Sequence, residues 1–150
     1  MKTIFDTTTR EELIQRINSL NEDSEPIWGK MSVYQMAKHC TIWNEWVLGK
    51  KDFVYKQDFF GKIFGKMVLK SNTKDDKPIS KNMPAGKAFT VKEMEDDLKT
   101  QKSIWTEQIL TYENFSNDCF VHDFFGKMTK EQIGIFAYKH NDHHLRQFNT

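Results

Sequence analysis

A short capping pattern constrains the fold most strongly: Ser or Thr followed three residues later by Glu or Gln, ahead of four segments with helical periodicity. In such a capping box the two side chains satisfy backbone N–H groups that the first turn of a helix leaves unpaired. The boxes begin at Thr8 or Thr9, Ser32, Thr90 and Thr129. They predict helices over about residues 9–20, 32–49, 90–112 and 129–147, with Gly49 ending the second.

The connection between the second and third predicted helices is long. Residues 59–69 predict a short extra helix despite two glycines, and residues 70–86, rich in Lys, Asp, Asn and Pro, predict a loop. Such a crossover lets the second and third helices run in the same direction. No strand-like alternation persists long enough for a sheet. We therefore expect one all-α domain over residues 1–150, a four-helix bundle with a long connection between helices 2 and 3.

Composition limits the possible environments and partners. The apolar fraction of 38% and charged fraction of 29% are typical of a globular protein. The net charge of +1, without a block of like charge, argues against a nucleic-acid partner. No apolar run reaches the roughly 18 residues of a transmembrane helix, and the N-terminus lacks the apolar stretch of a signal peptide. We expect a cytoplasmic protein with no membrane partner, in which Cys40 and Cys119 are buried and unpaired.

The histidines carry the only distinct chemical signal. His140 and His144 are four residues apart, about 400° of helical rotation and roughly 6 Å of rise, so both rings leave one helix face. His39 falls in the apolar stripe of the second helix and can supply a third ligand. Three buried imidazoles without a common partner would each lack hydrogen bonds, whereas a shared divalent cation satisfies all three. Three protein ligands and an open position are typical of a catalytic metal site.

Several assignments stay open on the sequence alone. A core histidine can instead be hydrogen-bonded to backbone or a carboxylate, and a histidine pair near a chain end can be solvated. His143 is an alternative to His144, which we prefer because four-residue spacing follows the apolar stripe better. His143 and Asp142 either support the metal ligands or face water. His122, just before the fourth helix, either acts as an acid, base or substrate contact at the site, or is a loop histidine. No catalytic residue is assigned.

Three segments resemble a known family. They are Trp-Gly-Lys-Met-Ser at 28–32 with Gln-Met-Ala-Lys-His-Cys at 35–40, His-Asp-Phe-Phe-Gly-Lys-Met-Thr at 122–129, and Tyr-Lys-His-Asn-Asp-His-His-Leu-Arg-Gln-Phe at 138–148. With them the whole chain resembles the DinB-like (DinB/YfiT-like) superfamily of four-helix-bundle metalloenzymes, closest to a bacterial subgroup of unknown function. One departure is Asp123, because relatives tend to show His-Pro before the two phenylalanines.

The resemblance implies a divalent metal, usually nickel or zinc, held by His39, His140 and His144. Characterised relatives are mostly transferases that use a low-molecular-weight thiol (bacillithiol, mycothiol or glutathione), with some isomerases. We therefore expect a metal-dependent S-transferase or hydrolase acting on a small molecule. Lys38 and Arg146 are candidates for binding the carboxylates of a thiol.

The competing interpretation is a non-catalytic binding or stress-associated bundle whose metal site is vestigial or structural. In that case the many aromatic residues serve the core and a subunit interface. Exposed side chains among Phe53, Phe59, Phe60 and Phe64 would point to a homodimer.

Overall fold

Five α-helices, two short 3₁₀ helices and a small hairpin make up the part of the chain that the structure, a computed structural model, describes: residues 1–81, 83, 86–93 and 97–150. The α-helices are α1 (Thr7–Ser19), α2 (Val33–Leu48), α3 (Phe59–Thr73), α4 (Leu98–Thr111) and α5 (Lys130–Gln147). The 3₁₀ helices are η1 (Lys87–Phe89) and η2 (Tyr112–Asn114). Strands β1 (Val121–His122) and β2 (Gly126–Lys127) pair antiparallel.

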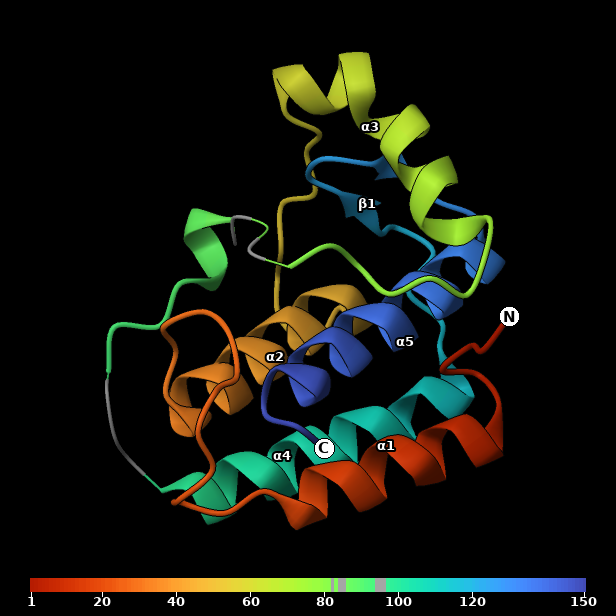
Figure 1. Ribbon diagram of the computed structural model, residues 1–150. Coiled ribbons are helices and arrows are strands. Elements are labelled where there is room, and N and C mark those ends of the chain that lie inside the picture. Colours follow the sequence, from red (N-terminus) through yellow and green to blue (C-terminus); the bar gives the residue numbers. More distant parts are fainter. Residues whose placement is uncertain (82, 84–85, 94–96) are drawn as a thin grey trace.

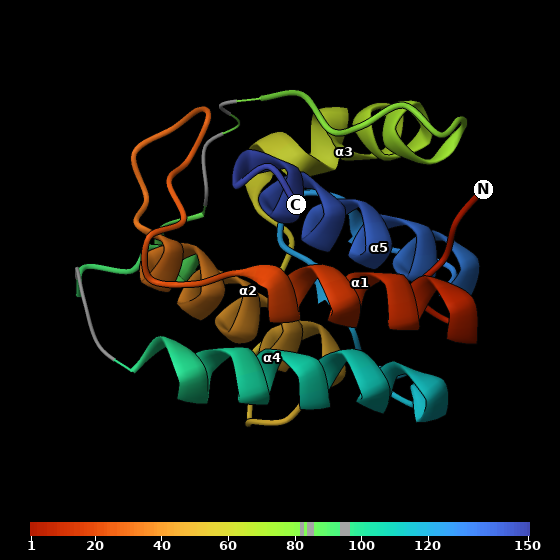
Figure 2. The same cartoon turned by 60° about the horizontal axis from the view of Figure 1, so that its bottom comes forward.

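Helices α1, α2, α4 and α5 form the bundle (Figure 1). Helices α1 and α2 each contact both α4 and α5, whereas α3 lies outside and packs on α5 and β2. Helices α2 and α4 run in the same direction, and α1 and α5 run opposite to them (Figure 2). The predicted all-α four-helix bundle, with a long crossover between its second and third helices, is therefore confirmed.

Two of the predicted capping boxes form in full. At the start of α2, the Ser32 hydroxyl accepts from the Gln35 N–H at 3.2 Å and the Gln35 side chain accepts from the Ser32 N–H at 3.0 Å. Thr129 and Gln132 repeat these bonds at the start of α5. Gly49, with a φ of 68°, ends α2 in the left-handed conformation that glycine adopts without strain. The two helices that carry the histidines thus begin where local sequence predicts.

The other two boxes do not form, and these predictions are wrong. Helix α1 begins at Thr7 after Asp6, with no side-chain cap. Helix α4 begins at Leu98, where the Asp97 carboxylate accepts from the Thr100 N–H at 2.9 Å. Residues 90–93 are not helical, and residues 94–96 of the predicted helix lie outside the described residues.

The segment before α4 is tied to α2. The Phe89 carbonyl oxygen lies 2.8 Å from His39 Nδ1, and the Val91 carbonyl accepts from Gln35 Nε2 at 3.4 Å. Where the sequence predicts the first turn of a helix, the structure thus has a non-helical segment held against α2.

Helix α3 is longer than predicted and packs through its glycines. A Cβ added at Gly61 or at Gly65 would lie 2.2 Å from the Phe124 carbonyl oxygen. Glycine at both positions therefore lets α3 lie directly on the hairpin turn. The glycines that weaken the helical prediction are the residues that allow the helix to dock.

The opposite face of α3 is apolar and exposed. Its side chains are 47–70% exposed: Phe59, Phe60, Ile63, Phe64 and Met67. Phe53, by contrast, is partly buried against the core. The homodimer remains a prediction. Among the described residues, no helix combines the length and apolar character needed to cross a bilayer.

The bundle core contains Cys40, which is fully buried, but not Cys119, which is exposed. The prediction that both cysteines are buried is therefore wrong for Cys119, which lies in the turn before β1. Four side chains with no exposure show where the core sits: Leu13, Met36, Trp105 and Leu145.

Candidate metal centre

Three histidines from α2 and α5 lie together and could bind a metal ion. One ring nitrogen from each of His39, His140 and His144 lies within 4.8 Å of the others. His39 and His144 are 3% and 8% exposed. The three residues are called the histidine cluster below. His143 is not part of it; its ring packs against Trp28 and against His144.

The spacing inside the histidine cluster suits a cation. His39 Nε2 lies 3.3 Å from His140 Nε2. Two imidazole nitrogens bound to one zinc ion at about 2.0–2.1 Å, with a tetrahedral angle, are about 3.3–3.4 Å apart. The other nitrogen separations in the cluster are at most 4.8 Å.

Outer hydrogen bonds orient two of the rings. His39 Nδ1 lies 2.8 Å from the Phe89 carbonyl, which can only accept, so Nδ1 carries the hydrogen and Nε2 presents a lone pair. His144 Nδ1 lies 3.1 Å from Gln147 Oε1. The Gln147 amide nitrogen donates to the Trp28 carbonyl at 2.8 Å, which fixes the amide orientation and makes Oε1 the acceptor. Both rings thus present Nε2 as a ligand, the arrangement typical of metal-binding histidine.

His140 has no such outer partner in the described part of the chain. Its Nδ1 is buried without a hydrogen bond, while its ring stacks on Trp43 with centroids 4.0 Å apart and planes 20° apart. A hydrogen on Nδ1 leaves a buried donor unpaired and two Nε2 lone pairs facing each other. A hydrogen on Nε2 leaves the Nδ1 lone pair unpaired. A cation between the Nε2 atoms removes the lone-pair repulsion, so these residues fit a bound metal.

Burial keeps all three imidazoles in the form that binds metal. Desolvation lowers the pKa of His39, and lowers the pKa of His140 and His144 well below the ordinary value, with neighbouring histidines adding to the shift. The rings are therefore neutral at pH 7. Metal binding does not have to displace a proton from them.

A cavity of about 440 Å³ opens beside the histidine cluster. Its walls come from α2, α5, η1, the hairpin and the start of α3. The wall is mainly apolar and aromatic, and includes Trp43, Phe89, Phe125 and Phe136. A cluster that opens on a cavity can leave a coordination position for a ligand other than protein.

His122 lies on β1 and lines this cavity, although it is not part of the histidine cluster. Its Nδ1 lies 3.1 Å from the Phe124 backbone nitrogen, 3.3 Å from the Phe125 backbone nitrogen and 2.9 Å from Asp123 Oδ1. The sequence left its position open, and the structure places it at the cavity wall.

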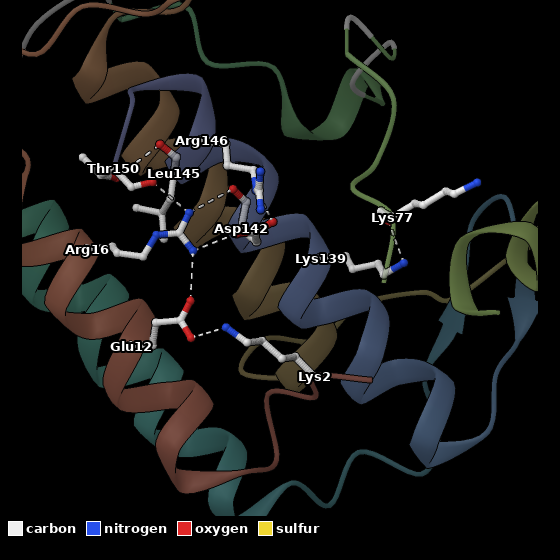
Figure 3. A network of polar contacts seen from close by, with 9 residues as sticks. All are labelled: Lys2, Glu12, Arg16, Lys77, Lys139, Asp142, Leu145, Arg146 and Thr150. Carbon is white, nitrogen blue, oxygen red and sulfur yellow. Dashed lines mark hydrogen bonds and ion pairs between the residues drawn. The ribbon is translucent and has the colours of Figure 1, made fainter. Parts of the chain in front are cut away.

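Asp142 does not support the histidine cluster. Its carboxylate accepts from Arg16 at 2.7 Å and from Arg146 Nε at 2.8 Å (Figure 3). Glu12 extends this network along α1. Arg146 is therefore engaged by Asp142, and neither it nor Lys38 is among the described residues that line the cavity.

Sequence reasoning missed the groups that orient the rings. Gln147 follows His144 by three residues, a spacing that puts both on one helix face, so this signal was present. The Phe89 and Trp28 carbonyls left no local signal, because they lie 50 and 119 residues from the side chains that they bind.

Comparison with known proteins places the chain in a family without a described activity. No curated protein and no solved structure matches it. A family model described as "Protein of unknown function (DUF1569)" matches residues 2–150. The chain therefore belongs to the DUF1569 family.

Proposed function

We propose that this protein is a metal-dependent enzyme in which His39, His140 and His144 hold one divalent cation, nickel or zinc. The observation that carries the proposal is the convergence of one ring nitrogen from each of the three histidines within 4.8 Å, with the Nε2 atoms of His39 and His140 3.3 Å apart. Outer hydrogen bonds hold His39 and His144 so that each presents Nε2 as a ligand. The resemblance to the DinB-like superfamily supports the same three ligands.

A cation bound there supplies Lewis acidity, which lowers the pKa of a bound water or thiol toward neutrality. The chain's own residues do the rest. The Phe89 carbonyl and the Gln147 amide orient His39 and His144, and Trp43 holds the plane of the His140 ring. The aromatic wall limits the access of bulk water to the reacting groups. Transfer of a low-molecular-weight thiol and hydrolysis of a small molecule both fit this site.

His122 is the candidate for moving a proton in this reaction. It lines the cavity, and its Nδ1 lies 2.9 Å from the Asp123 carboxylate, so an imidazole and a carboxylate meet at this wall. A group at this position can give a proton to a leaving group or contact the substrate directly.

The alternative is a non-catalytic binding or stress-associated bundle with a structural or vestigial metal site. Structural zinc sites are typically closed by four protein ligands. The described residues bring together three histidines beside a cavity. This observation favours the enzyme over the alternative.

Elemental analysis of protein purified without an affinity tag tests the proposal. We expect about one nickel or zinc per chain, lost in both His39→Ala and His144→Ala. His143→Ala is the matched control, because His143 lines the cavity but lies outside the cluster. Wild-type protein that binds no nickel or zinc on incubation with either metal overturns the proposal. Equal loss of metal from His143→Ala shows that the ligand set is wrong.

A further inference from the structure

The cavity beside the histidine cluster has an acidic edge. Asp58, at the start of α3, and Asp123, in the hairpin turn, both line it. The Asp58 backbone N–H donates to the Asp123 carbonyl at 2.7 Å, so the two residues meet at one edge. A Cβ added at Gly86 would lie 3.5 Å from Asp123 Oδ2, which places this carboxylate against the crossover.

Asp123 is held in its charged form. Its Oδ1 lies 2.9 Å from His122 Nδ1 and accepts from the Phe124 N–H at 2.8 Å. The contact with His122 is the main cause that lowers the pKa of Asp123. The carboxylate is therefore negative throughout the neutral range.

No positive side chain balances this edge among the described residues that line the cavity. Arg146 binds Asp142 instead, and the Lys81 ammonium lies 4.3 Å from the Trp28 ring centroid. The described part of this wall therefore offers no ammonium or guanidinium group to a thiol's carboxylates. Lys38 and Arg146, the candidates for that role from the sequence, do not line it.

The rest of the cavity is mainly apolar, and it reaches the half-buried ring of His140, whose Nδ1 has no hydrogen-bond partner among the described residues. A ligand that fills about 440 Å³ therefore meets three different environments. It meets the histidine cluster and its cation, then an aromatic wall, and then the Asp123 carboxylate. Charged groups in such a partly enclosed space interact more strongly than they do in water.

We infer that this cavity selects small molecules with a metal-binding head, an apolar body and an uncharged or cationic tail, and that Asp123 is the residue that disfavours anionic tails. The inference rests on the proposed function, since the head is bound through the metal. It points away from cosubstrates that carry several carboxylates and toward neutral or amine-bearing thiols or substrates.

Cobalt(II)-substituted protein tests the inference, because a thiolate bound to cobalt gives a charge-transfer absorption band. Three thiols of similar length serve as probes: 2-mercaptoethylamine, 2-mercaptoethanol and 3-mercaptopropionate. Dissociation constants are corrected for each thiol's own pKa in the same buffer. We expect the amine to bind at least about fivefold more tightly than the carboxylate, with the alcohol between them.

Asp123→Asn is expected to remove most of this discrimination. Asp118→Asn, which changes an exposed aspartate that is not among the described cavity residues, is expected to leave it unchanged. The wild-type comparison stands by itself if Asp123→Asn does not fold. Equal or tighter binding of the carboxylate by the wild type, or discrimination that persists in folded Asp123→Asn, overturns the inference but not the proposed function. Protein that binds no cobalt overturns both, whereas cobalt protein that binds none of the three thiols overturns the inference alone.

Discussion

Two buried polar clusters lie next to each other between α2 and α5, and they differ in whether their hydrogen bonds close. The asparagine cluster consists of Asn44, Trp105, Tyr112 and Asn141. In it, Asn141 Oδ1 accepts from Trp105 at 2.7 Å and from Asn44 at 3.1 Å. Asn44 Oδ1 accepts from Tyr112 at 2.8 Å. The remaining amide hydrogens reach backbone carbonyls of the same helices.

The histidine cluster lies beside the asparagine cluster, because His140 directly precedes Asn141 in the chain. Its hydrogen bonds do not all close. His140 Nδ1 has no hydrogen-bond partner among the described residues, and the Nε2 atoms of His39 and His140 face each other. Apart from His140, which is half-buried, the side chains of both clusters are buried. The difference teaches that a closed polar network specifies the packing of the bundle, whereas an open one is poised for a ligand.

The largest expected effect comes from His140→Leu. We expect metal affinity to fall by at least about 1000-fold, because one of three ligands is lost. The metal-free protein should be as stable as wild type or more stable, since an unpaired buried polar group is removed. Competition with a chelator measures the first effect, and urea unfolding of metal-free protein measures the second. A large loss of stability in the metal-free variant would show that the histidine cluster is structural, and would break the comparison.

Asn141→Leu changes the next residue along the chain, and it should destabilise the metal-free protein. It leaves the Trp105 N–H and an Asn44 N–H without their acceptor, and we expect the free energy of unfolding to fall by about 2–4 kcal/mol. Urea unfolding of metal-free protein measures this change. The exposed Asn18 on α1 supplies the control Asn18→Leu, expected to change stability by less than about 0.5 kcal/mol. If Asn141→Leu and Asn18→Leu are equally stable, the asparagine cluster contributes nothing measurable to the free energy of unfolding.

Gln147→Met sharpens the comparison within the histidine cluster. The variant keeps side-chain length but removes the acceptor that orients His144. We expect a 10- to 100-fold loss of metal affinity, about the effect of removing an outer hydrogen-bond partner of a metal ligand. The same chelator competition measures it, with Gln15→Met on the exposed face of α1 as control. Unchanged affinity would mean that packing alone holds the ring.

The pH dependence of stability gives the smallest expected effect. His140 stays neutral in the folded protein below its ordinary pKa of 6.5, whereas the unfolded chain takes up a proton there. The unfolded state thus binds more protons, and metal-free protein should lose stability as pH falls below about 6.5. Between pH 7.5 and 5.5, His140→Leu should reduce the total loss of stability by about 1.4 kcal/mol. Urea unfolding between pH 7.5 and 5.5 compares the two proteins, and equal slopes would show that His140 is protonated when folded.

Local hydrogen bonding explains which helix starts could be predicted. The boxes at Ser32 and Thr129 form because each hydroxyl and the glutamine three residues later close both hydrogen bonds locally. The box at Thr90 does not form, and the neighbouring Phe89 and Val91 carbonyls contact side chains of α2 instead. Helix α3 shows where local sequence misleads. Its two glycines argue against a helix on sequence alone, but in the structure they allow the helix to contact the Phe124 backbone.

The sequence by itself determined that four helices form the bundle, where α2 and α5 begin, and that His140 and His144 share a helix face, because helical period and capping act over a few residues. Tertiary structure alone decided that His39 meets this pair, that two distant carbonyls help to orient the rings, and that the hairpin brings His122 and Asp123 to the cavity. These contacts join residues 50 to 119 positions apart. No local preference encodes them, because they depend on how the helices pack.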